Sequence, residues 1–151
     1  MSTSTPNLRL RRIDPIEVIR GRPEMYLPFG RVSGPDLMTT LVSEAVKLSG
    51  AEVISRHLED WWIVASPVDW TARFHLNDIT SYFHSILPDP DGAPNALCGA
   101  IRLVAFARDV VTQSADQSTT IQGVVSYDEA IWRYARAHPE WHRIIAFRME
   151  E

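Results

Sequence analysis

The sequence predicts an α+β domain, because helical and strand patterns occur in pairs along the chain. Residues 36–49 carry apolar side chains at helical spacing, whereas residues 52–66 contain two short strand patterns separated by a turn at Glu59-Asp60. Residues 109–126 contain a second pair of strand patterns. With 151 residues, of which 45% are hydrophobic, the chain can bury the core of one domain.

A short first helix is predicted at residues 15–21. Asp14 stands at the capping position, a proline occupies the first helical position, and Glu17 lies three residues after the cap, as in a capping box. Arg22-Pro23 should then force an extended exit, since a residue before proline avoids the helical region.

A longer helix is predicted at residues 36–49. Asp36 is the expected cap, and Gly50 stands where a left-handed residue ends a helix. One apolar stripe consists of Leu37, Leu41, Ala45 and Leu48, with Met38, Val42 and Val46 beside it. The helix should therefore bury a wide face.

A hairpin should follow, with strands at 52–58 and 61–66. Successive side chains of a strand point to opposite faces of the sheet, so Trp61 and Trp62 must point in opposite directions. We expect one tryptophan in the core and the other over a sheet edge.

The second half of the chain predicts two more helices before the next strands. A helix at 78–87 should end at Pro88, and after a proline-rich loop another helix should run from about Asn95 to Arg108. Strands are then predicted at 109–114, 119–126 and 141–149. Ser126 and Glu129 have the spacing of a capping box that starts a helix continuing to Ala137.

Composition limits the classes of function. The net charge is −4, so a nucleic-acid surface would have to be a local patch, and we expect the N-terminal arginines to belong to a solvated arm and loop. These arginines are Arg9, Arg11, Arg12, Arg20 and Arg22. A single cysteine, Cys98, fits a reducing compartment, and no apolar run approaches the roughly 20 residues of a membrane span. We expect a cytoplasmic protein with a flexible arm at 1–12 and one domain at 13–151.

Residues 16–27 contain the most specific motif of the chain. Its pattern is carried by Val18, Arg20, Arg22, Pro23, Met25, Tyr26 and Leu27. This run resembles the loop that opens the ATPase domain of DNA gyrase B and type II topoisomerases, which belong to the GHKL, or Bergerat-fold, group. The resemblance implies a two-layer sandwich with helices on one face of a mixed, mainly antiparallel sheet. The helix near 126–137 would be an addition to that fold.

The same resemblance implies an ATP and magnesium site, which this sequence does not preserve. Glu44 aligns with the family's general base, but Leu48 replaces the asparagine that holds magnesium, and leucine has no oxygen ligand to offer. In the region of the family's adenine-binding D-x-G-x-G motif, Asp69 remains without the glycines. In the phosphate-binding region, Gly99 is kept but Ile101 replaces a glycine.

We therefore expect a non-catalytic, nucleotide-free module that binds an unidentified protein partner or acts in regulation, with no cofactor and no direct nucleic-acid ligand. The alternative is a divergent ATP-binding protein whose site is built around Glu44, Asp69 and Gly99. Leu48 and Ile101 should close the space of the missing nucleotide. A partner would bind at that face or at the helix of 127–137, where Arg133 and Tyr134 are of the residue types that dominate interfaces.

Two weaker patterns suggest a metal or thiol hydrolase. His138 and His142 have the spacing of a metal pair on a helix, but Pro139 interrupts that helix and Glu140 does not complete a known motif. Cys98 near a helix start could be reactive with His75 or His84 as its base, or it could be a buried apolar residue.

Overall fold

The computed structural model describes residues 14–27, 30–93, 98–115 and 117–150, and it confirms the α+β class. The strands form an open five-stranded sheet in the order β1-β2-β5-β3-β4. Their bounds are Ile54–Leu58 for β1, Trp61–Ser66 for β2, Asp109–Ser114 for β3, Gln117–Gln122 for β4 and Arg143–Arg148 for β5. The predicted arm at 1–12 lies outside the described residues.

The expectation of a mixed sheet is wrong, because every pairing among these strands is antiparallel. β1–β2 and β3–β4 are the two predicted hairpins. The last strand, β5, enters between them and runs antiparallel to both β2 and β3. The final segment of the chain thus joins the two hairpins into one sheet.

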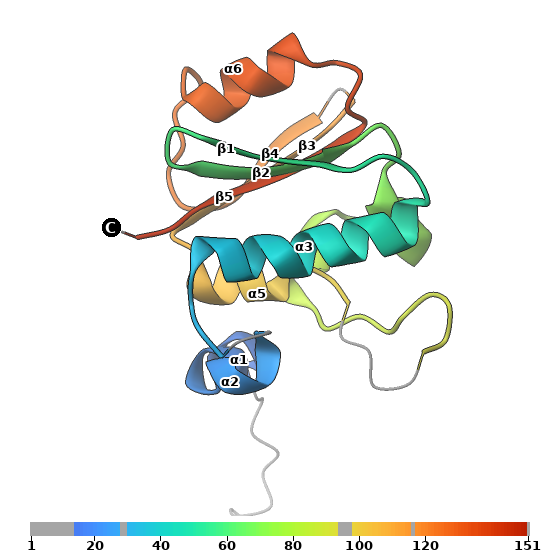
Figure 1. Ribbon diagram of the computed structural model, residues 1–151, viewed down its shortest axis with the longest axis vertical. Coiled ribbons are helices and arrows are strands. Elements are labelled where there is room, and N and C mark those ends of the chain that lie inside the picture. Colours follow the sequence, from blue (N-terminus) through green and yellow to red (C-terminus); the bar gives the residue numbers. More distant parts are fainter. Residues whose placement is uncertain (1–13, 28–29, 94–97, 116, 151) are drawn as a thin grey trace, which may run out of the picture.

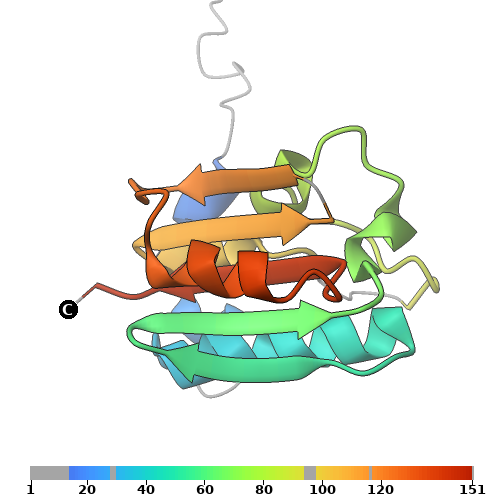
Figure 2. The ribbon, with the colours of Figure 1, turned by 90° about the horizontal axis from the view of Figure 1, so that it is seen from above.

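Helices cover both faces of the sheet, so the expected two-layer arrangement is also wrong (Figure 1). On one face lie α3, Gly34–Ser49, and α5, Ile101–Phe106, with α1, Pro15–Gly21, and α2, Pro23–Tyr26, farther out. On the opposite face lies α6, Ala130–Ala137. Figure 2 shows α6 over the middle of the sheet. Within the described ranges, no helix is long and apolar enough to cross a membrane.

The ends of α3 follow from its flanking residues. Ser33 is the cap in place of the predicted Asp36, and its Oγ accepts a hydrogen bond of 3.2 Å from the Asp36 backbone N–H. Pro35 fits the first turn because the backbone groups there have no helical partner. Gly50 ends the helix at φ 62°, as predicted for a left-handed stop.

Several other boundaries differ from the sequence predictions. Pro23 starts the short helix α2 where an extended exit was expected, and the helix predicted at 78–87 is limited to α4, Thr80–His84. The helix predicted from Asn95 appears only as α5, and residues 94–97 lie outside the described ranges. β1 and β5 are shorter than predicted, and β4 begins and ends earlier in the chain than predicted. β2 and β3 have the predicted bounds.

The predicted capping box of α6 is not formed. Glu129 is itself the N-cap residue, and no side chain caps this helix. The Glu129 carboxylate instead accepts hydrogen bonds from Arg148 Nη1 at 2.9 Å and from the Trp61 indole at 3.4 Å. Arg148 and Trp61, which are buried on the sheet, thus bind the Glu129 carboxylate that the capping-box pattern assigned to the start of the helix.

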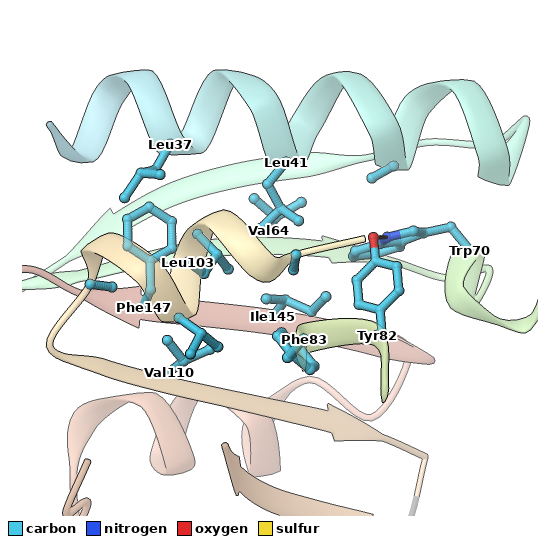
Figure 3. Packing of buried hydrophobic residues seen from close by; sticks show 14 of the residues in the cluster. Leu37, Leu41, Val64, Trp70, Tyr82, Phe83, Leu103, Val110, Ile145 and Phe147 are labelled. Atoms are coloured by element: carbon cyan, nitrogen blue, oxygen red, sulfur yellow. Dashed lines mark hydrogen bonds between the residues drawn. The ribbon is translucent and has the colours of Figure 1, made fainter. Parts of the chain in front are cut away.

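Two apolar clusters lie on opposite faces of the sheet. Trp61 is fully buried in the cluster beneath α6, and Trp62 is half-buried on the other face, where it stacks on His57. The larger cluster lies between the sheet and α3 (Figure 3). Its labelled members are Leu37, Leu41, Val64, Trp70, Tyr82, Phe83, Leu103, Val110, Ile145 and Phe147. The opposite directions of the two tryptophans confirm the strand prediction.

Gly34 fixes how closely α3 approaches β2. A Cβ at this position would lie 2.3 Å from Cε2 of Trp62, whereas a Cβ at Gly21, in α1, would meet nothing within 4 Å. We expect Gly34→Ala to destabilise the fold by about 1 to 3 kcal/mol through overpacking. Gly21→Ala should be neutral or stabilising by up to about 1 kcal/mol. Urea unfolding of both variants measures the difference, and equal midpoints would contradict this close contact.

Candidate functional site

Glu44 lies at the centre of a hydrogen-bond network that joins three segments of the chain. Its two carboxylate oxygens each lie 3.0 Å from the backbone N–H of Gly99, which donates to them. The Tyr82 hydroxyl donates to the same carboxylate, and this hydroxyl in turn accepts a 3.0 Å hydrogen bond from the Trp70 indole. Figure 3 shows the Tyr82 hydroxyl directed at Trp70.

The backbone around Gly99 is shaped for this contact. Gly99 has φ +95°, and a Cβ there would lie 2.9 Å from the carbonyl oxygen of Tyr82. The next residue, Ala100, donates its N–H to that carbonyl at 2.8 Å. Leu87 and Cys98 exchange two backbone hydrogen bonds of 3.2 Å. A residue with a side chain at position 99 would be strained and crowded. The backbone geometry therefore accounts for a glycine here, and no phosphate ligand is needed to explain it.

Burial controls the ionisation of this network. Burial raises the pKa of Glu44, while hydrogen bonds from Tyr82 and Gly99 and the charge of Arg102 act in the opposite direction. Burial and the nearby Glu44 carboxylate raise the pKa of Tyr82 well above its ordinary value. The site therefore favours a tyrosine that stays protonated and donates to the carboxylate.

Cys98 does not have the properties of a nucleophile. Burial and the neighbouring carboxylates Glu44 and Asp89 raise its pKa to about 11, so the thiol is protonated at neutral pH. Within the described residues, no hydrogen bond connects Cys98 with His75 or His84. The buried apolar alternative is the one that the structure supports, because the side chain is 6% exposed.

A hollow of about 450 Å³ lies beside Glu44, between α3, the end of the opening loop and α5. We call it the Glu44 hollow. Its apolar wall contains Met25, Tyr26, Leu27 and Leu48, and its charged lining residues are Glu44, Lys47 and Arg102. Leu48 and Ile101 are 3% and 4% exposed, so both are buried as expected. The expectation that they close the space is wrong, because charged side chains form part of the wall.

The two cations of the hollow differ in their partners. Lys47 forms an ion pair with the buried Asp89, and this contact raises the pKa of Lys47 and lowers that of Asp89. Burial lowers the pKa of Arg102, although the charge of Glu44 opposes this effect. The Nε atom of Arg102 is buried and has no hydrogen-bond partner among the described residues.

Asp69 serves the fold and is not part of this site. Its carboxylate accepts hydrogen bonds of 3.0 and 2.9 Å from Nε and Nη2 of Arg143, and it also accepts from the backbone and hydroxyl of Thr71. Burial would raise the pKa of Asp69, but the hydrogen bonds from Arg143 and Thr71 lower it. Of the three residues of the alternative ATP site, the structure thus brings together Glu44 and Gly99 only.

The opening loop contributes both to the fold and to the hollow. Arg20 Nε donates to the carbonyl of Ala105 at 2.7 Å, which ties α1 to the last turn of α5. Pro23 begins α2, and Arg22 is exposed with its Nη1 3.7 Å from the sulfur of Met25. Met25 is 60% exposed, whereas Leu27 is buried. Met25 is therefore available to a ligand.

The remaining candidate residues lie elsewhere. His138 Nδ1 is 3.0 Å from the Glu140 carboxylate, and no group of three or more potential metal ligands occurs in the described part of the chain, so His142 completes none there. Tyr134 is only 7% exposed and belongs to the cluster beneath α6, which corrects its expected role as an interface anchor. Arg133 is exposed and donates to the carbonyl of Asp128.

Sequence patterns missed two residues of the network. Tyr82 and Trp70 occupy apolar positions, yet the Trp70 indole donates to the Tyr82 hydroxyl, which in turn donates to Glu44. The only signal in the sequence is the residue type, since a buried tyrosine or tryptophan usually needs a hydrogen-bond partner. Arg102 was also missed, as a charged residue within an apolar helical stretch.

Comparison of this chain with models of protein families, with curated proteins and with solved structures finds no match.

The burial of Leu48 gives a direct test of the pocket wall. Leu48→Asn removes apolar packing and buries an amide without a partner, so it should destabilise the fold by about 2 to 4 kcal/mol. Val46→Asn is a control on the same helix, because Val46 is 52% exposed and surface changes stay within about 0.5 kcal/mol. Urea midpoints that are indistinguishable for the two variants would show that Leu48 is not buried.

The raised pKa of Glu44 predicts a pH dependence of stability. The folded state holds the Glu44 proton more tightly than the unfolded state, for which the ordinary value is 4.5, so the parent protein loses stability as pH rises above that value. Glu44→Gln should lose this contribution, and its stability relative to the parent should increase from pH 4.5 toward neutrality.

Tyr82→Phe should have the reverse effect, because it removes a donor that favours the ionised carboxylate. Its stability relative to the parent should fall over the same pH range. Chemical unfolding at a series of pH values measures both slopes. A Glu44→Gln difference that is constant with pH would contradict the raised pKa.

Proposed function

We propose that this chain is a non-catalytic, GHKL-like module that holds no nucleotide and acts as a protein-binding or regulatory domain. The proposal is carried by one observation, namely that the Glu44 carboxylate is occupied by Gly99 and Tyr82. A general base must reach the proton that it removes, in hydrogen-bond contact with the substrate or with one water. Here both carboxylate oxygens already accept hydrogen bonds from the protein.

The contact between Glu44 and Gly99 also occupies Gly99, the residue that the sequence shares with the family's phosphate-binding region. A phosphate-binding loop works because its backbone N–H groups point at the ligand. The N–H of Gly99 points at Glu44, so a negatively charged side chain stands where such a loop would present its donor. A phosphate at this place would lose that donor and would meet the carboxylate. The apolar Leu48 offers magnesium no ligand beside it.

The open hollow favours a second candidate, a divergent ATP-binding protein. Its volume of about 450 Å³ lies in the range of small-molecule sites, and Lys47 and Arg102 line it. Asp69 would not take part, since its carboxylate is already bound to Arg143 and Thr71. We therefore place this candidate second.

Titration with ATP separates the two candidates. Calorimetry with the full chain should give no saturable heat with ATP, with or without magnesium, and phosphate release should equal that of a protein-free control. The physical reason is that neither a free phosphate donor at Gly99 nor an oxygen ligand at Leu48 is present. A micromolar dissociation constant that Glu44→Gln weakens would support the divergent ATP-binding protein instead.

Ser43→Ala is a matched control for that titration, because Ser43 lines the Glu44 hollow one position before Glu44. If ATP binds and both variants weaken it equally, the effect belongs to the hollow in general. If only Glu44→Gln changes binding, the carboxylate itself takes part.

A further inference from the structure

We propose that the Glu44 hollow binds a small organic carboxylate, a monoanion with an apolar body, and that Arg102 binds the carboxylate group. This inference rests on the proposed function, because it assigns a ligand to a site that we propose holds no nucleotide. The observations that carry it are a lining arginine that has no ion pair among the described residues, the balance of charges at the lining and the apolar lining residues.

Arg102 supplies the donor. Its Nε is buried and has no acceptor among the described residues, and buried donors without acceptors are uncommon in folded proteins. The guanidinium group lies at the hollow, since Arg102 is one of the lining residues. Arginine presents a planar fork of N–H groups that matches the two oxygens of a carboxylate. Because Nε itself is closed off from solvent, a carboxylate in the hollow would be bound through the terminal Nη groups of Arg102.

The charged residues around the hollow favour a ligand with one negative charge over a ligand with two. Lys47 is already neutralised by Asp89, so it has no net charge to offer a ligand. Arg102 remains as the cation, and Glu44 stands beside it as a carboxylate. The Glu44 carboxylate at the lining repels further negative charge. A doubly charged phosphate group would meet stronger repulsion than a carboxylate.

The apolar lining residues suit an apolar body. Met25, Tyr26 and Leu27 from the opening loop, with Leu48 from α3, form this apolar lining. Met25 is 60% exposed, and a methionine side chain adapts readily to the shape of a ligand. A volume of about 450 Å³ is far more than a bare ion needs and is typical of small organic ligands.

Phenylacetate is a suitable probe, and the Met25 methyl group is a suitable reporter. The full chain labelled at its methionine methyl groups would be titrated with phenylacetate and followed by NMR. We expect a saturable shift of the Met25 signal, with Met38, which does not line the hollow, as the internal reference. Absence of a saturable Met25 shift at millimolar phenylacetate would overturn the proposal.

Two matched compounds test the chemistry of the head group. Phenylacetamide keeps the shape but has no charge, and benzylphosphonate keeps the ring but carries two charges above its second ionisation. Phenylacetamide should bind about tenfold more weakly than phenylacetate, because loss of a charge-assisted hydrogen bond has an effect of that size. Benzylphosphonate should also bind more weakly, because its second charge is repelled by Glu44. Tighter binding of benzylphosphonate would overturn the carboxylate assignment, and equal binding of phenylacetamide would remove the role of charge.

Variants then test the role of Arg102. Arg102→Gln should weaken phenylacetate by about tenfold or more, whereas Arg133→Gln, an exposed change on the opposite face, should leave it unchanged. Arg102→Lys keeps the charge without the fork and should give an intermediate loss, which also covers the case in which the glutamine variant does not fold. Unchanged affinity in a folded Arg102 variant would overturn the proposal.

The same Met25 signal separates this inference from the proposed function. A shift of the signal by ATP would contradict the nucleotide-free module, whatever phenylacetate does. Failure of phenylacetate without any response to ATP would overturn the carboxylate ligand and leave the nucleotide-free module standing.

Discussion

The carboxylate of Glu44 is the constraint on which the helical layer depends. A buried acid must find donors, and Glu44 finds them in Tyr82 of α4 and in Gly99, just before α5. α3 is therefore tied to two segments that follow it by about 40 to 55 residues. The Trp70 indole extends the network to the segment that follows β2. A residue that the sequence suggests as a catalytic relic is thus also a connector of the core.

The sheet has a comparable polar frame at the two ends of β5. Arg143, at its start, is bound by Asp69 and by the hydroxyl of Thr112. Arg148, at its end, is bound by Asp109 at 2.9 Å and by Glu129. Each buried guanidinium needs such partners to offset its desolvation. The partners come from β3 and from the segments that follow β2 and precede α6, so the last strand is fastened to both hairpins.

Most regular elements could be predicted from local patterns, whereas only Glu44 and Gly99 of the site were indicated by the sequence. The burial of Leu48, the helix end at Gly50 and the opposite directions of Trp61 and Trp62 follow from helix or strand geometry. A short window of sequence is enough to predict such features. The Glu44 network joins residues far apart in the chain, and Tyr82 looks apolar in its own helix. The position of β5 and the layer formed by α6 likewise depend on long-range packing, which the family resemblance did not provide.

The persistence of the hollow follows from the mixture of groups around it. Leu48 could bury itself between α3 and the sheet, and Ile101 could bury itself against Ile19 of α1, because apolar surface gains about 25 cal/mol per Å² on leaving water. Lys47, Arg102 and the outer side of Glu44 gain nothing comparable, because each would lose hydration on closure. The buried Leu48 therefore packs into the core without filling the adjacent space. Charged groups beside apolar side chains thus keep this space open to solvent.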